Sequence, residues 1–194
     1  MNITQALAEI SKIHIHQDAK QVCQTVADEL KLITHRSEIL QHNDKKVSPQ
    51  KGCFYISTGN DIAFDGLNFE EMLKKYNTGF VYFRIDESGS GVLIASRSNL
   101  LYAGFTYIVE DCANDDITKY KEGKIFPASF AWQRLSYDYF LTQSGRTQRS
   151  FNREEYIKFC ARIGVTHVEV NGLAYPMGIE EGVKGETYQM FYTY

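Results

Sequence analysis

Apolar and polar residues along the first 112 positions follow patterns that predict alternating strands and helices. Isoleucines alternate with histidines over residues 13–16, which is typical of a strand. An apolar stripe at helical spacing then predicts a helix from Asp18 to about Ile33. The compact run CFYIS at residues 53–57 predicts a further buried strand.

The clearest pattern is a hairpin followed by a helix. Residues 79–86 and 92–95 have strand composition, and the short segment ESGSG between them favours a tight hairpin loop. A helix is predicted over residues 98–111, and its Ala103-Gly104 pair indicates close approach to a sheet.

Less regular segments flank these elements. We expect a loose arm or short helical turn in residues 1–10, and a short helix within residues 64–76. Residues 34–51 read as a surface loop with a short strand at Ile39-Leu40. Together these elements predict an α+β domain over residues 1–112, a two-layer sandwich with helices on one face of a mixed sheet.

A second module follows a charged stretch. Residues 113–127 are polar and are predicted to be a linker, and residues 128–194 to be a separate segment. A strand at about 129–140, a helix at 152–163 ending at Gly164, and a strand at 165–170 predict a parallel β-α-β step.

This step is typical of the start of a (β/α)₈ barrel, which needs about 250 residues. The sequence has 24 residues after Val170, so we expect an incomplete barrel. The second strand should then expose an apolar edge, because no further strand is predicted to cover it.

Composition limits the kinds of molecule that the chain is expected to bind. The net charge of −3 and the absence of basic runs longer than two residues argue against nucleic acid. The N-terminal residues lack the basic and apolar regions of a signal peptide, and no apolar run is long enough for a membrane span. We therefore expect a soluble chain that binds neither nucleic acid nor membrane, in an unknown compartment.

The sequence offers few candidate metal ligands. The cysteines, Cys23, Cys53, Cys112 and Cys160, are widely spaced without a CxxC pair, and are expected to be buried free thiols. His14 and His16 would share one strand face, where a pair can bind metal, but a solvated strand face is the favoured interpretation because no third ligand stands nearby in the sequence. We expect no metal and no cofactor.

Several short motifs resemble, in their order, the non-catalytic domain that precedes the barrel in family 20 β-N-acetylhexosaminidases and family 67 α-glucuronidases. The matching pieces are Ala27-Asp28-Glu29-Leu30, Phe54-Tyr55-Ile56-Ser57-Thr58-Gly59, Gly79-Phe80-Val81-Tyr82-Phe83, Val92-Leu93-Ile94-Ala95-Ser96 and Asn99-Leu100-Leu101-Tyr102-Ala103-Gly104. The second module is similar to the start of that barrel, through Arg134, Arg149-Ser150-Phe151 and Gly164-Val165-Thr166.

The resemblance implies sugar-binding residues on the first two barrel strands. Family members bind sugar with a first-strand arginine, which implicates Arg134; a salt bridge is an equally weighted alternative. Asp138 lies further along the same strand, and Glu169 and Asn171 share one parity on the second strand. The family's catalytic carboxylates lie on later strands, so no catalytic residue is assigned here.

Three functions are therefore considered. The first is the accessory domain and barrel start of a larger glycoside hydrolase-like protein, inactive alone, whose partner is the remainder of the barrel and whose ligand is a glycan. The second is a free-standing carbohydrate-binding or homo-oligomeric module that uses the aromatic C-terminus. The third, weaker, is a small enzyme that uses Cys160 or His167.

Overall fold

The computed structural model describes residues 1–59, 62–65, 67–131, 133–136, 153–173 and 189–192. The chain divides into two compact units, unit 1 (residues 1–131) and unit 2 (residues 132–194). Each unit is described by itself.

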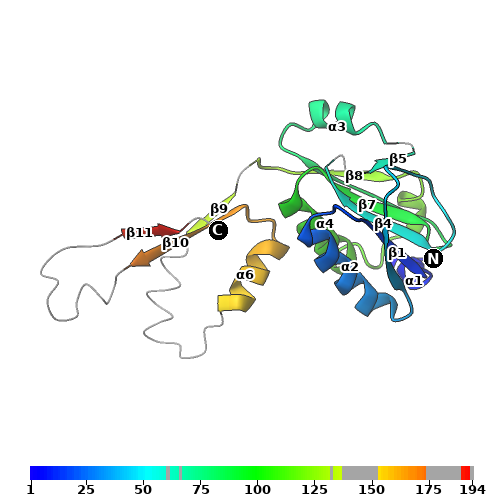
Figure 1. Cartoon of the computed structure of the whole chain (residues 1–194), viewed down its shortest axis with the longest axis horizontal. Helices are drawn as coiled ribbons and strands as arrows, with labels where there is room; N and C mark the ends of the chain where they lie inside the picture. Colours follow the sequence, from blue (N-terminus) through cyan, green and yellow to red (C-terminus); the bar gives the residue numbers. More distant parts are fainter. Residues whose placement is uncertain (60–61, 66, 132, 137–152, 174–188, 193–194) are drawn as a thin grey trace, which may run out of the picture. The chain divides into compact units, whose positions relative to one another are not determined.

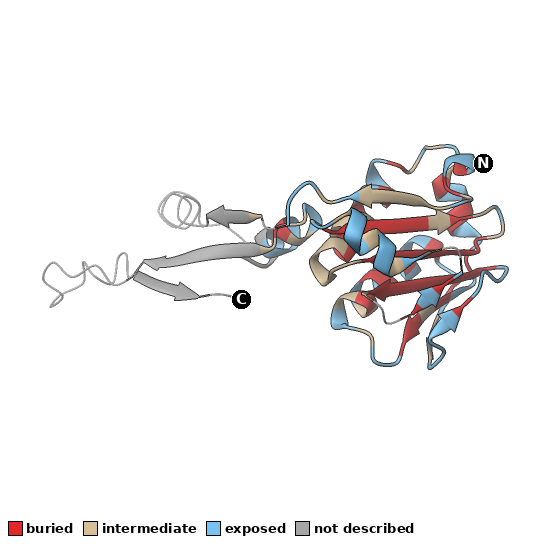
Figure 2. Ribbon diagram, turned by 90° about the horizontal axis from the view of Figure 1, so that it is seen from above, coloured by how far each residue is buried: buried red, intermediate tan, exposed pale blue. Residues whose placement is uncertain are grey.

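Unit 1 is built on a six-stranded mixed sheet in the order β2-β1-β4-β7-β6-β8 (Figure 1). Strands β2, β1, β4 and β7 are mutually parallel, and β6 runs antiparallel to β7 and β8. Their bounds are β1 Lys12–His16, β2 Glu38–His42, β4 Cys53–Thr58, β6 Phe80–Ile85, β7 Gly91–Ala95 and β8 Lys124–Pro127. The central strands β4 and β7 are buried along their whole length (Figure 2).

Two long helices cover one face of this sheet. Helix α2 (Gln21–Thr34) packs against β1, β2 and β4, and α4 (Ser98–Glu110) packs against β4, β6 and β7 (Figure 1). A Cβ added at Gly104 would lie 2.8 Å from both methyl groups of Val81, which confirms the close approach predicted from the Ala-Gly pair. The helices also contact each other, and the Tyr102 hydroxyl donates a 2.5 Å hydrogen bond to Glu29.

The opposite face of the sheet is covered in part by the segment that connects β4 to β6. This segment contains β5 (Ala63–Phe64), which pairs with β3 (Lys46–Val47), and the short helix α3 (Phe69–Lys75). Phe69 and Met72 of α3 pack against the buried cluster that contains Phe80 and Tyr82. The predicted α+β two-layer sandwich is confirmed, with this smaller helical cover added on the second face.

Both ends of unit 1 are more ordered than the sequence indicates. Helix α1 (Ile3–Ala8) begins at a capping box in which Asn2 and Gln5 exchange hydrogen bonds, and it buries Ile3, Ala6 and Leu7. Of the two expected forms for residues 1–10, the helical turn is the one observed.

The segment predicted to be a linker, residues 113–127, contains regular structure of unit 1. The 3₁₀ helix η1 (Ile117–Lys119) is followed by β8, which pairs with β6 at the edge of the sheet. Tyr120 is fully buried, and its ring lies 5.5 Å from that of Phe83. Charged residues dominate this stretch, so the few aromatic side chains that attach it to the sheet are hard to recognise. The structure divides the chain between Ala131 and Trp132 instead.

Unit 2 contains the predicted β-α-β order. Strand β9 (Arg134–Ser136), helix α6 (Arg153–Arg162) and β10 (His167–Leu173) follow in sequence, and β9 and β10 are parallel. Gly164, at φ 75°, ends α6 in the left-handed region, and the amide of Val165 donates to the Cys160 carbonyl.

The expected open edge of the second strand is not observed. Strand β11 (Gln189–Tyr192) pairs antiparallel with residues 170–173 of β10, so the sheet order is β11-β10-β9. That prediction was wrong because the aromatic C-terminal segment, which has strand-forming residues, was treated as having no place in the sheet. The barrel itself stays a prediction.

Candidate functional site

The predicted sugar-binding residues fall on the strands of unit 2. Arg134 opens β9 and is in register with His167 of β10. Glu169 is in register with Ser136, and Asn171 stands two positions further along β10. These positions have one parity, so the backbone brings Arg134, Glu169 and Asn171 to one face of the sheet. Asp138 lies outside the described residues.

A second group of ionisable side chains lies in unit 1. The sequence pattern indicates only two of its members. His14 and His16 of β1 share one sheet face with His42 of β2, because His16 and His42 are in register. The ring of His42 lies 6.0 Å from that of His14 and 5.6 Å from that of His16. Tyr55 of β4, in register with His14, stacks on it at 4.9 Å and meets His42 at 5.8 Å. We call His14, His16, His42 and Tyr55 the histidine cluster.

Several polar atoms of the cluster lack partners. Nε2 of His14 and both ring nitrogens of His42 are out of contact with solvent and make no hydrogen bond of good geometry within the described part of the chain, although a weaker contact of His42 with the Asp44 backbone acts to raise the His42 pKa. His16 differs, because its Nδ1 accepts a 3.2 Å hydrogen bond from the Asp18 amide. Leaving a buried polar atom unpaired costs about 1–3 kcal/mol, so a set of three such atoms calls for a physical explanation.

Burial is the main cause of the pKa shifts in the histidine cluster. It lowers the pKa of His14, and the nearby charges of His42 and Lys12 lower it further. Burial also lowers the pKa of His42, with a smaller lowering by His16 and an opposing effect of Asp44. Burial raises the pKa of the Tyr55 hydroxyl. Each of these shifts favours the uncharged form, so His14, His42 and Tyr55 are neutral near pH 7.

The cluster lies where the connections of the sheet diverge. The chain leaves β1 through α2, on one face, whereas it leaves the neighbouring strand β4 through β5 and α3, on the other. Open α/β sheets bind ligands at the carboxyl ends of such strands. Ser57, two residues after Tyr55, adds a buried hydroxyl without a hydrogen-bond partner among the described residues.

This third histidine was missed because it stands 26 residues from His16 in the sequence, on an edge strand of mixed polarity. The solvated strand face expected for His14 and His16 is wrong, since His16 is buried and His14 is half-buried against Tyr55. Across the residues that the structure describes, no three His, Cys, Asp or Glu side chains converge as a metal ion requires.

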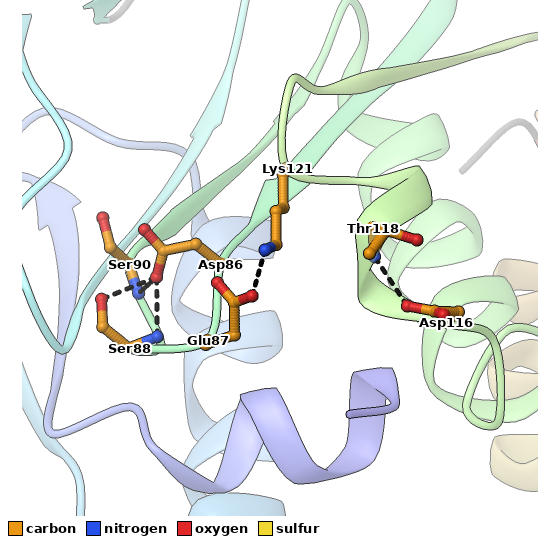
Figure 3. A network of polar contacts seen from close by, with 7 residues as sticks. All are labelled: Asp86, Glu87, Ser88, Ser90, Asp116, Thr118 and Lys121. Carbon is orange, nitrogen blue, oxygen red and sulfur yellow. Dashed lines mark hydrogen bonds and ion pairs between the residues drawn. The ribbon is translucent and has the colours of Figure 1, made fainter.

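Carboxylates near the β6–β7 hairpin have structural partners (Figure 3). Asp86 accepts hydrogen bonds from the amides of Ser88 and Ser90 and from the Ser88 hydroxyl, which closes the turn. Glu87 pairs with Lys121, and this hydrogen bond lowers the pKa of the Glu87 carboxyl. The Thr118 amide does the same for Asp116, which caps η1. These groups stabilise turns and are not an acid–base pair.

A groove of about 730 Å³ lies between β5 and the start of α3, with Phe64 and Phe69 among its apolar residues. Part of its charged rim is paired, since Ser48 donates a 2.6 Å hydrogen bond to the Asp65 carboxyl and Lys46 lies 3.3 Å from it. These two contacts lower the pKa of Asp65.

The expected buried free thiols are confirmed at all four cysteines. Cys160 is only 3% exposed, which does not favour its use as an accessible nucleophile. Within the described ranges, no helix combines the length and apolar character needed to cross a bilayer.

Comparison of the chain with protein-family models, with curated proteins and with solved structures finds no match in any of the three.

Proposed function

We propose that the chain carries the accessory domain and the first β-α-β step of a larger glycoside hydrolase-like protein, and that it has no hydrolase activity alone. Unit 1 would be the accessory domain, and β9, α6 and β10 the beginning of the catalytic barrel. Arg134, Asp138, Glu169 and Asn171 would be its contribution to sugar binding.

One observation carries this proposal: each family-like motif lies, in order, on the kind of element that the resemblance requires. The Ala27–Leu30 motif is in α2, and the isoleucine-containing motif that ends at Gly59 forms β4. The next two motifs form the two strands of the β6–β7 hairpin, and the Asn99–Gly104 motif lies in α4. All of these elements belong to one domain, and a parallel β-α-β unit follows it.

The surface of α6 adds support. Ile157, Phe159 and Ile163 are exposed by 60%, 52% and 45% respectively. A barrel helix contacts its sheet on one side and neighbouring helices on its flanks, so additional barrel helices would give these side chains partners.

The direct test is hydrolysis of a panel of aryl glycosides that includes β-N-acetylglucosaminides and α-glucuronides. The protein purified from its native cells is compared with the 194-residue chain. We expect turnover by the native protein and none by the chain, because a glycosidase needs positioned catalytic groups that the resemblance assigns to later strands.

Arg134→Lys in the native protein is a useful companion variant. Lysine keeps the charge but loses the rigid donor fork, so KM should rise about tenfold, the equivalent of about 1.4 kcal/mol of sugar binding, with little change in thermal stability. Turnover by the chain itself, abolished by a substitution within it, contradicts the proposal, as does a native protein inactive on every glycoside.

One observation favours the alternative of a free-standing carbohydrate-binding or homo-oligomeric module. Strand β11 fills the edge of β10 that a third parallel strand would occupy in a barrel. If unit 2 is such a module, the chain should bind glycans or form a stoichiometric oligomer without further domains.

A further inference from the structure

The histidine cluster joins the edge strand β2 to the rest of the sheet. Among the described strands, β2 pairs only with β1, over residues 38–42. Its apolar residues Ile39 and Leu40 are only half-buried, whereas β4 is buried throughout. An edge strand with little buried apolar surface is the kind of element that opens locally before the core unfolds. The ring of His42 therefore adds to the pairing with β1 and the packing of α2 that hold β2 in place.

These ring contacts depend on the imidazoles being neutral. Protonation of His42 would place a positive charge 5.6 Å from the His16 ring and 6.0 Å from the His14 ring, by ring centroids. Lys12 adds a further positive charge from β1. The opposing carboxylates, Asp18 after β1 and Asp44 after β2, are both exposed, so their attraction is screened by water.

The remaining groups that face the cluster do not offset this repulsion. Glu38 is in register with Lys12 at the opposite end of β2 from His42, and it is exposed. Cys53 and Tyr55 of β4 are buried, and burial raises the pKa of the Tyr55 hydroxyl, so Tyr55 carries no charge that could offset the repulsion. The balance of charge around the rings thus turns unfavourable as they take up protons.

We propose that His14 and His42, packed beside His16 and Tyr55, form an acid-sensitive latch that holds the edge strand β2 against β1 at neutral pH and releases it on acidification. An imidazole whose pKa is lower in the folded state takes up its proton more readily when the strand is open. The latch is therefore fully closed above the unperturbed histidine pKa of about 6.5, and its stabilisation is lost as the pH falls through that value toward the lowered one.

The test is amide hydrogen exchange of the full 194-residue chain at pH 7.5 and pH 5.5, expressed as protection factors so that the intrinsic pH dependence cancels. We expect a clear loss of β2 protection at pH 5.5, because the open strand takes up protons on His14 and His42 more readily than the closed strand does. Protection of β4 and β7 should be retained. Unchanged protection of β2, or an equal fall in all strands, overturns the proposal.

Two substitutions identify the residue responsible. His42→Phe keeps an aromatic ring that cannot be protonated, and it should reduce the acid-induced loss at β2, with His14 accounting for what remains. His35→Asn removes an exposed histidine outside the cluster and suits its left-handed backbone (φ 58°), so the loss should persist. A loss that is as large in His42→Phe as in the unaltered chain overturns the proposal.

If His42→Phe does not fold, His14→Phe replaces it, since phenylalanine can keep the stack on Tyr55. Titration of the imidazole proton resonances of the unaltered chain gives an independent check. We expect the His14 and His42 resonances to titrate below pH 6.5; titration of both at or above that value overturns the latch.

Discussion

At the residue scale, some backbone contacts in unit 1 leave no space for one added carbon atom. A Cβ at Gly91, the first residue of β7, would lie 2.2 Å from the carbonyl oxygen of Arg84 on the neighbouring strand. A Cβ at Gly59 would meet no atom of the described residues within 4 Å, although its φ of +64° disfavours other residues. The two glycines are thus required for different reasons, one steric and one conformational.

Gly91→Ala should destabilise unit 1 by about 1–3 kcal/mol or more, since the strands must move apart to admit the methyl group. Gly59→Ala is the matched control and should cost about 1–2 kcal/mol, the penalty of a left-handed backbone alone. Urea unfolding of the two variants measures the difference. A control that costs as much as Gly91→Ala or more would refute the steric account.

Residues that act together across strands were the hardest to find from the sequence. His14 and His16 were noticed because they stand two positions apart, but His42 joins them only through the parallel register of β1 and β2. The pattern of residues within one segment does not show which residues of two separate strands will pair. The parity shared by Glu169 and Asn171 was visible because both lie on one strand, β10.

At the element scale, prediction succeeded where local signals were strong. The β6–β7 hairpin has its glycine-containing loop, and α4 has a regular apolar face. Strand β8 lacked such a signal, because its residues are only partly buried and charged residues precede it. Its place in the sheet comes from pairing with β6, a contact between distant parts of the sequence.

The place of β8 can be tested by truncation. A chain of residues 1–131 should unfold cooperatively, and one of residues 1–123 should be less stable by at least about 2 kcal/mol, because Ile125 and Phe126 lose their packing. The expected fall in Tm is roughly 5–10 °C. Equal Tm values for the two chains would instead support a linker at residues 113–127.

At the scale of the whole molecule, an α+β domain is followed in the sequence by a β-α-β unit. The structure describes the two units separately, and the proposed relation between them rests on the ordered motifs of unit 1 and the parallel pairing of β9 with β10. The antiparallel β11 is the observation that most favours a different relation. The barrel start and the free-standing module therefore differ in whether further barrel strands and helices follow unit 2 in the native protein.

The most direct test of the central claim is the mass of the native protein, detected in its own cells with an antibody raised against residues 1–131. The account predicts a band far above the 22.3 kDa of this chain, because the rest of a barrel would be present. A single band at 22.3 kDa would contradict it and would favour a free-standing binding or oligomeric module.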